Sequence, residues 1–478
     1  MSLRKKVISG VKWSTLSTTI LVVVNLLKIA ILTRLLAKSD FGIIAIVTTV
    51  LGFVELFMDM GIPTAILHKQ RITRKEYASL YWFNLFFSVS LIIIIFFISP
   101  FIAQFFDEPL LKKIIPIMSF SILFAALGKQ FKIISQKKLH FKYISIVEII
   151  SATCGLITCV TLAICKFGVY ALVFGILTQH IVLNFIFLIK GLINSGIVFY
   201  FNFTKIKSFL KIGIYQTGSQ IINFFNKNLD VFIIGKIFGS EILGGYNLAK
   251  QLAWRPLQII DPIMIKITNS IFPKFQDNKL ILRQYFLKLL KGMSFINSIV
   301  YGLIATYAYY IVLLFYGNKF IEITPYVQAF CFVMCFRSLG GIIGILAVTT
   351  GRTNYEFYWN IFTTLIIPPV IVIASIFSIN MIIIFLGIIN FVFLLLLWNF
   401  FYKKLISLSF RVYIKSFIFQ LILMLIMVLM GVLLFNGLLI WKIFISLTMI
   451  ILLTINNYSF LKEIRTRSIN KNNKSIVW

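Results

Sequence analysis

The fold is decided by a stretch of sequence that occurs twice, as Arg34-Leu-Leu-Ala-Lys-Ser-Asp-Phe-Gly42 and as Lys236-Ile-Phe-Gly-Ser-Glu-Ile-Leu-Gly244. Each copy has a basic residue, an apolar pair, a Ser-acid step and a glycine that opens the next apolar run. The same offset of 202 residues aligns Asp59 with Asp261. Because both copies begin on the same side of the membrane, they predict parallel repeats about an axis along the membrane normal.

The composition around these copies is that of a membrane protein. Of the 478 residues, 60% are hydrophobic and only 13% are charged, and the mean hydropathy is +0.98. A soluble surface needs about 25–35% charged residues. The apolar residues also form runs long enough to cross a bilayer as helices. These figures exclude a soluble domain, a disordered chain, collagen and a disulfide-rich secreted scaffold, and they predict an all-α polytopic membrane protein.

The apolar runs predict fourteen transmembrane helices, the first too long for a cleavable signal peptide. Helices 1–6 and 7–12 are expected to form two six-helix parallel-repeat lobes around a central cavity, followed by two C-terminal helices. The predicted domains are 1–200 (N-lobe), 201–402 (C-lobe) and 403–478 (helices 13 and 14 with a basic tail). The helices are expected at 12–36, 42–67, 80–106, 114–134, 144–165, 169–189, 209–234, 244–270, 286–315, 323–349, 357–377, 380–401, 416–435 and 437–457.

The net charge of +32 comes from 46 Lys+Arg against 14 Asp+Glu. In a soluble protein such a balance suggests nucleic acid. Here most basic residues lie in the loops on one side of the predicted helices, as the positive-inside rule requires of cytoplasmic loops. We therefore expect no nucleic-acid partner, and we expect both termini in the cytoplasm.

Polar residues repeat along one face of the first helix of each half. The spacing is 4-3-4-3 in Gln216, Gln220, Asn223, Lys227 and Asp230, and the equivalent positions are Ser14, Thr18, Leu21, Asn25 and Lys28. A polar stripe that faces lipid is costly, so these faces are expected either to bond to neighbouring helices or to line the central cavity.

Further charges lie inside the predicted spans, where ionisable residues are functional candidates. An excess of cations favours an anionic substrate group such as phosphate. The candidate substrate-binding residues are Lys28, Asn25, Lys227, Asp230, Asn223, Lys250, Arg255 and Arg337. The candidate ion-coupling residues are Glu55, Asp59 and Asp261.

Other chemistry has little support in the sequence. The five cysteines lie in or beside apolar runs and have no Cys-x-x-Cys spacing, so we expect neither a disulfide nor a metal site. The chain has no phosphate-binding P-loop, no His-Glu-x-x-His and no Gly-x-Ser-x-Gly. We therefore expect no catalytic residues and no cofactor.

Several motifs resemble one known family. The opening Met1-Ser-Leu-Arg-Lys-Lys-Val-Ile-Ser-Gly-Val-Lys-Trp-Ser14 is similar to the start of colanic-acid-exporter-like polysaccharide transporters. The other matching stretches are Asp40-Phe-Gly42, Leu80-Tyr-Trp-Phe-Asn84, Gly128-Lys-Gln-Phe-Lys-Ile-Ile-Ser-Gln-Lys-Lys-Leu-His-Phe141, Gly244-Gly-Tyr-Asn-Leu-Ala249 and Phe272-Pro-Lys-Phe275. The resemblance covers predicted helices 1–10 and fades over helices 11–14. The family belongs to the multidrug, oligosaccharidyl-lipid and polysaccharide exporter superfamily.

The resemblance implies a flippase of the bacterial inner membrane. It implies alternating access that moves undecaprenyl-diphosphate-linked oligosaccharide to the periplasmic leaflet for surface polysaccharide synthesis. The implied partners are that lipid-linked oligosaccharide, membrane lipids, and the polysaccharide polymerase with its chain-length machinery. The alternatives are a cation-coupled drug or lipid II exporter of the same superfamily, or a polytopic polysaccharide polymerase.

Overall fold

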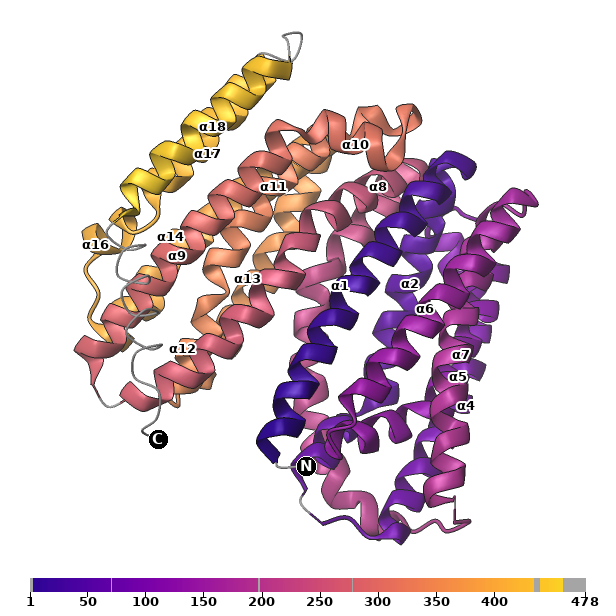
Figure 1. Cartoon of the computed structure of the whole chain (residues 1–478). Coiled ribbons are helices and arrows are strands. Elements are labelled where there is room, and N and C mark those ends of the chain that lie inside the picture. The colour runs from indigo at the N-terminus through magenta and orange to yellow at the C-terminus, as the bar shows by residue number, and fades with distance from the viewer. Residues whose placement is uncertain (1–2, 70, 197, 277, 434–438, 459–478) are drawn as a thin grey trace. The chain divides into compact units, whose positions relative to one another are not determined.

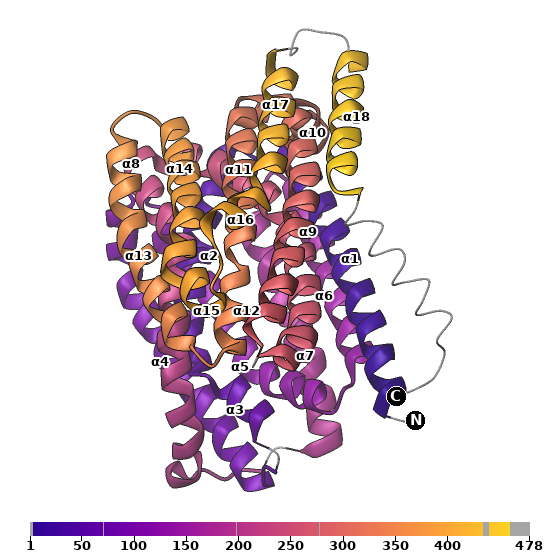
Figure 2. The same ribbon diagram turned by 90° about the vertical axis from the view of Figure 1, so that its left-hand side faces the viewer.

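The protein is helical throughout the part that the structure describes. This computed structural model describes residues 3–69, 71–196, 198–276, 278–433 and 439–458, and they form helices without any strand (Figures 1 and 2). Eleven helices within these residues are long and apolar enough to cross a membrane, and Ile418–Val432 is a shorter apolar helix. The expectation of an all-α, multi-span membrane protein is confirmed.

Every predicted span has a helix at its position, but several spans are divided or joined differently from the prediction. The predicted helix 42–67 is divided into α2 (Lys38–Asp59) and α3 (Ile62–His68), with Met60 and Gly61 both at positive φ. The predicted helices 209–234 and 244–270 form one long element, α8 (Phe203–Ile271), which is broken at Gly239. The predicted helix 286–315 is divided at Tyr307. The count of fourteen membrane crossings stays a prediction.

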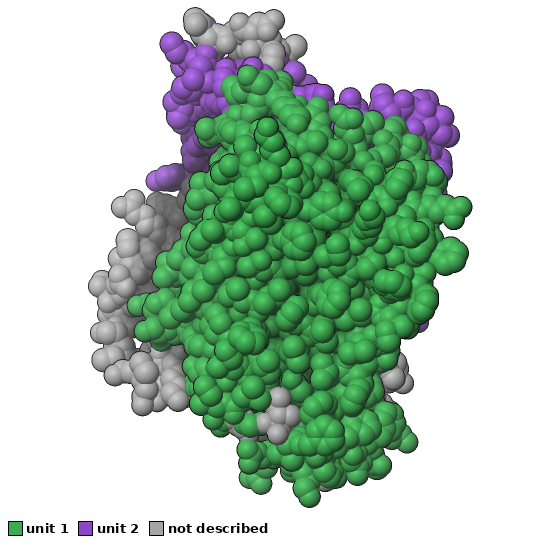
Figure 3. Space-filling model, turned by 90° about the vertical axis from the view of Figure 1, so that its right-hand side faces the viewer, with its two compact units in different colours: residues 1–248, 313–321, 363–368 green, residues 249–312, 322–362, 369–478 purple. Residues whose placement is uncertain are grey.

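The chain forms two compact units, coloured separately in Figure 3. Unit 1 comprises residues 1–248, 313–321 and 363–368, and unit 2 comprises 249–312, 322–362 and 369–478. Besides α2, α3 and the first part of α8, unit 1 contains α1 (Leu3–Leu35), α4 (Arg74–Phe105), α5 (Leu111–Lys137), α6 (Phe141–Ile164) and α7 (Val169–Ser195). The domain boundaries expected from the repeat stay a proposal.

Unit 1 is a bundle whose helices pack in a chain of neighbours. α1 packs on α6, α6 on α7, α7 on α5, and α5 on α4 (Figure 1). One apolar core cluster takes residues from four of these helices: Tyr81, Phe131, Ile144, Val147 and Phe187. Capping defines where α4 starts, because the Thr73 hydroxyl and the Glu76 carboxylate bond each other's backbone N–H groups.

Unit 2 contains the rest of α8 and a second group of packed helices. α9 packs against α11 and α17, α11 packs against α14, and α17 packs against α18. The helices of this group are η1 (Phe272–Phe275), α9 (Lys279–Thr306), α10 (Ala308–Tyr316), η2 (Asn318–Ile323), α11 (Thr324–Gly340), α12 (Ile342–Thr349), α13 (Thr353–Ser375), α14 (Ile379–Leu397), η3 (Trp398–Tyr402), α15 (Lys403–Ile406), α16 (Phe410–Lys415), α17 (Ile418–Leu433) and α18 (Leu439–Asn456). Parts of α10, η2 and α13 are assigned to unit 1.

The two copies of the repeated stretch contact each other within unit 1. A Cβ atom on Gly42 would overlap the backbone carbonyl oxygen of Ser240, and one on Gly244 would overlap that of Lys38. Gly42 and Gly244 occupy equivalent places in the repeat, and so do Lys38 and Ser240. The contact is therefore reciprocal, as between two copies related by a two-fold axis. Only glycine permits this approach of the two backbones.

Candidate functional site

A group of charged side chains lies among the helices of unit 1. Its members come from five helices, and we call it the ionic cluster. It comprises Lys28 of α1, Glu55 and Asp59 of α2, Lys129 and Lys132 of α5, Glu148 of α6 and His180 of α7.

Two ion pairs connect the helices of the ionic cluster. The Nζ atom of Lys129 lies 2.5 Å from Oδ1 of Asp59, and the Nζ atom of Lys132 lies 2.8 Å from Oε1 of Glu148. Between 24% and 30% of each of these four side chains is exposed. The pairs are therefore neither sealed in the core nor fully on the surface, and they tie α5 to α2 on one side and to α6 on the other.

Two further members lie within electrostatic reach of these pairs. The Glu55 carboxylate, one helical turn before Asp59, experiences the charges of Lys129 and Asp59. The imidazole of His180 experiences the positive charges of Lys28, Lys129 and Lys132. The seven side chains therefore form one interacting group, although they span more than 150 positions, from Lys28 to His180, in the sequence.

The local sequence explains how α5 brings its lysines into the group. Gly128 immediately precedes Lys129, and a Cβ atom there would overlap the backbone of Asn184 on α7. Small residues at such positions allow membrane helices to approach closely. On α2, the spacing of four residues places Glu55 and Asp59 on one face.

The balance of charge in the ionic cluster limits its chemistry. Three lysines, Lys28, Lys129 and Lys132, stand against the three carboxylates of Glu55, Asp59 and Glu148. Such a balanced group has no surplus charge to hold a diphosphate by itself, so Lys28 could contribute to a diphosphate site only together with cations outside the cluster. A carboxylate paired with lysine can instead exchange that partner for a proton or a metal cation from water, because each of them stabilises the same negative charge.

The polar stripe expected on the first helix interacts partly with its own backbone and partly with the ionic cluster. The Asn25 amide donates to the carbonyl oxygen of Leu21 on its own helix at 2.8 Å. Asn25 and Lys28 are both half-buried. Lys28 is the member of this stripe that reaches the ionic cluster.

The polar stripe expected on the predicted helix 209–234, which is the first arm of α8, has both exposed and buried side chains. Asn223 and Lys227 are exposed, whereas Asp230 is buried. The Asp230 carboxylate accepts a hydrogen bond of 2.6 Å from the Tyr246 hydroxyl and one of 3.0 Å from the backbone N–H of Val231. Asp230 and Tyr246 lie on opposite sides of the break at Gly239, so their bond joins the two arms of α8. The side chain of Gln216 lies outside the described residues.

The remaining candidates belong to unit 2. The Arg337 guanidinium lies over the Trp254 ring, 4.9 Å from its centroid, and Nη1 of Arg255 donates to Oε1 of Gln258 at 3.3 Å. Lys250 and Asp261 are half-buried. A cavity shared by Lys28, Lys227 and Arg337 stays a prediction, since these residues are divided between the two units.

Sequence reasoning missed two central members of the ionic cluster. Lys129 and Lys132 are part of the family motif at 128–141 and are not among the candidate site residues, although both lie within an apolar span, Leu111–Lys137. Their signal was the one that singled out Lys28, namely a charge inside a membrane helix. Within the described residues, no group of three or more His, Cys, Asp or Glu side chains is arranged to hold a metal ion.

Comparison with known proteins places the chain among polysaccharide biosynthesis proteins. A family model described as "Polysaccharide biosynthesis protein" matches residues 31–325. The lipopolysaccharide biosynthesis protein WzxC of Escherichia coli (strain K12) is 30% identical over 380 residues, which cover 78% of this chain and 76% of that protein. The teichuronic acid biosynthesis protein TuaB of Bacillus subtilis (strain 168) is 27% identical over 367 residues, covering 75% and 74%.

A solved structure has the same fold. The lipid II flippase MurJ, in an inward closed conformation, superposes with a TM-score of 0.77 at 16% sequence identity. The superposition covers 94% of this chain and 100% of that chain. At this identity the likeness concerns the fold alone.

Proposed function

Because the chain belongs to the polysaccharide biosynthesis protein family, we propose that it is a flippase for polyprenyl-diphosphate-linked oligosaccharides. The family membership confirms the resemblance drawn from the sequence motifs. The observation that carries the proposal is the match over residues 31–325, which includes both copies of the repeat and every member of the ionic cluster except Lys28. The substrate moves from the cytoplasmic to the periplasmic leaflet for surface polysaccharide synthesis, and the protein acts as a transporter rather than an enzyme.

The proposed substrate site uses cations to hold the diphosphate. Phosphate oxygens are bound well by Lys and Arg, which donate several charged hydrogen bonds. Lys28, Lys227, Lys250, Arg255 and Arg337 supply these charges, and the amides of Asn25 and Asn223 bond the sugars. Asp230 is held by Tyr246 at 2.6 Å and positions Lys227 one helical turn away on α8.

The proposed coupling site is the ionic cluster, with Asp261 at the position equivalent to Asp59 in the second repeat. The pairing of Lys129 with Asp59 supports this, because a proton or metal cation that binds Asp59 or Glu55 weakens the attraction between α5 and α2. Such a local change in helix packing can shift the equilibrium between the inward-open and outward-open conformations. The cation gradient would then drive the alternation of access.

The proposed location is the bacterial inner membrane with both termini in the cytoplasm. The charge asymmetry of the loops supports this orientation. The polysaccharide polymerase and the chain-length machinery are proposed as functional partners that consume the flipped substrate.

The decisive experiment is disruption of the gene in its own host. Surface polysaccharide should be lost, and lipid-linked oligosaccharide should accumulate where a glycosidase added outside the cytoplasmic membrane does not reach it. Complementation with the intact gene should restore export. If the accumulated oligosaccharide is instead fully accessible from the periplasm, the step lost is polymerisation and the flippase proposal is wrong.

A further inference from the structure

Unit 1 has three adjoining pockets near the start of α4 and the ends of α5 and α7. One pocket of about 460 Å³ is lined by Arg74 and Lys138, and another of about 540 Å³ by His140, Lys142 and Lys190. A small pocket of about 40 Å³ between them shares Lys138 with the first and His140 and Lys190 with the second. We call this continuous depression, with its five basic side chains, the basic groove.

The side chains that line the basic groove include cations but no carboxylate. All residues that line its three pockets are described, and none of them is aspartate or glutamate. The acids nearest in sequence have other partners, since Glu76 accepts from Nζ of Lys69 at 2.7 Å and Glu148 pairs with Lys132 at 2.8 Å. A concave surface with one sign of charge concentrates counter-ions, here anions.

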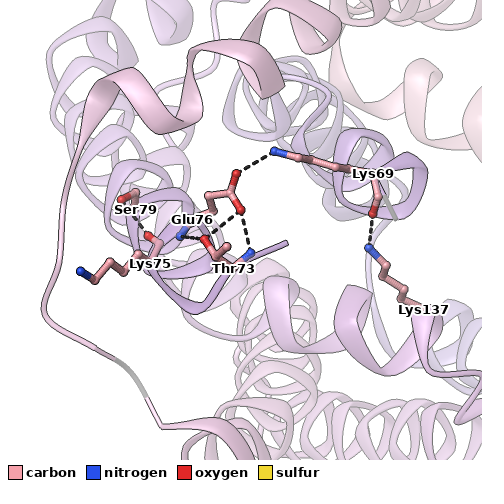
Figure 4. A network of polar contacts seen from close by, with 6 residues as sticks. All are labelled: Lys69, Thr73, Lys75, Glu76, Ser79 and Lys137. Carbon is pink, nitrogen blue, oxygen red and sulfur yellow. Dashed lines mark hydrogen bonds and ion pairs between the residues drawn. The ribbon is translucent and has the colours of Figure 1, made fainter. Parts of the chain in front are cut away.

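In the polar network beside the basic groove, Lys69, Glu76 and Lys137 are bonded to other groups of the protein (Figure 4). Lys137 donates from Nζ to the carbonyl oxygen of Ile66 at 2.8 Å and to that of Lys69. It therefore fixes the end of α3, whereas the next residue, Lys138, is exposed and lines the groove. Glu76 completes the network by capping α4 together with Thr73.

The basic groove lies where membrane spans end. The apolar helices next to it run over Arg74–Phe105, Leu111–Lys137, Phe141–Ile164 and Val169–Asn194, so its basic residues lie within about one helical turn of their termini or just beyond them. Aromatic rings accompany the cations, with Nζ of Lys190 3.4 Å from the ring centroid of Tyr143 and Nζ of Lys142 5.2 Å from that of Trp13. Such aromatic side chains are typical of the boundary between water and lipid.

The lining combines the two properties that a lipid head group requires. The cations offer donors to a phosphate, and the side chains of Ile134, Ile146 and Val198 offer apolar surface for the adjoining glycerol and acyl parts. Basic pockets between membrane helices on the cytoplasmic side bind anionic head groups in this way. We propose that the basic groove binds the phosphate head group of an anionic phospholipid in the cytoplasmic leaflet. The choice of leaflet rests on the orientation proposed above, but the binding itself does not.

The test uses the purified full-length protein in a neutral detergent. Thermal unfolding is measured during titration with phosphatidylglycerol, phosphatidylcholine, a polyprenyl phosphate or inorganic phosphate. Phosphatidylglycerol should raise the unfolding temperature saturably, whereas phosphatidylcholine and inorganic phosphate should not. This assay requires no transport, so its failure is distinct from failure of the flippase proposal.

Paired variants locate the binding. Lys138→Gln with Lys190→Gln should weaken phosphatidylglycerol binding about thirtyfold. Each basic residue near an anionic membrane surface contributes about 1 kcal/mol to binding, and the loss of two such residues corresponds to this change in affinity. Lys112→Gln with Lys113→Gln removes the same charge from two exposed residues at the opposite end of α5 and should leave affinity within about twofold. Lys138→Arg with Lys190→Arg should retain binding. If the first pair does not fold, Arg74→Gln with Lys142→Gln, both at exposed positions, replaces it.

Three results would overturn the proposal. The first is equal stabilisation by phosphatidylglycerol and phosphatidylcholine. The second is equal affinity in the groove and control variants, which would place the lipid elsewhere. The third is a groove-dependent preference for the polyprenyl phosphate or for inorganic phosphate, which would make the groove a site for substrate or for a soluble anion.

Discussion

Lys129 and Asp59 form an ion pair of 2.5 Å between α5 and α2, two helices separated by a whole further span in the sequence. The pair is about a quarter exposed, so it is partly shielded from water. Removing one partner leaves the other charge in this environment without its counter-ion, and this cost is larger inside a protein than on its surface.

Lys129→Ala should therefore destabilise the folded protein. We expect a loss of about 1–3 kcal/mol, between the values for exposed and for fully buried pairs. Thermal unfolding of the purified protein measures it, and Lys112→Ala, at an exposed position on the same helix, is the control with almost no effect. An unfolding temperature of Lys129→Ala equal to that of the control would show that the pair contributes nothing to stability.

Lys227→Ala separates transport from stability. Lys227 is exposed on α8, so its replacement should leave protein abundance unchanged but abolish export of surface polysaccharide. Lys227→Arg should retain some export, because the positive charge survives with a different geometry. Abundance is measured by immunoblot of membranes and export by the surface polysaccharide of a complemented strain.

The matched variant for Lys227→Ala is Asp230→Ala, on the same helix face. Asp230 is buried and bonded to Tyr246, so its loss should lower abundance as well as export. Normal export by a well-expressed Lys227→Ala protein would remove Lys227 from the substrate site and leave Lys28, Lys250, Arg255 and Arg337 as candidates.

Because the two copies of the repeat contact each other so closely, no side chain should be tolerated at Gly42 or Gly244. Gly42→Ala and Gly244→Ala should each destabilise the protein by about 1–3 kcal/mol, because the added methyl group meets a backbone carbonyl that has little room to move. Gly218→Ala, where a Cβ atom meets nothing within 4 Å, should be neutral or slightly stabilising. Unfolding temperatures of the three variants measure the difference, and three equal values would contradict the close approach.

The orientation predicts which loops are reached by a reagent added outside the cell. Single cysteines placed in a cysteine-free background within Lys69–Ser79 and Lys403–Arg411 should react only after the membrane is permeabilised. The same is expected of the tail after Tyr458, which lies outside the described residues. Labelling of the tail in intact cells would mean an odd number of membrane crossings and would undo the argument from parallel repeats.

The sequence by itself determined that this is a helical membrane protein, where its helices lie and to which family it belongs. In lipid, a backbone must satisfy its own hydrogen bonds, so an apolar run of sufficient length forms a helix whatever surrounds it. The motifs at 34–42 and 128–141 are local as well, and the family match covers both. Even the repeat was visible as a spacing of residues along the chain.

Only the tertiary structure decided which charges meet. Glu148 lies near one end of its helix and pairs with Lys132 of α5, and Asp230 bonds Tyr246 across the break at Gly239. The spacing along a helix tells which residues share its face, but a partner on another helix depends on the rotation and approach of both helices. Those are set by packing, such as the close contact of α5 with α7 at Gly128, and packing sums contacts from distant parts of the chain.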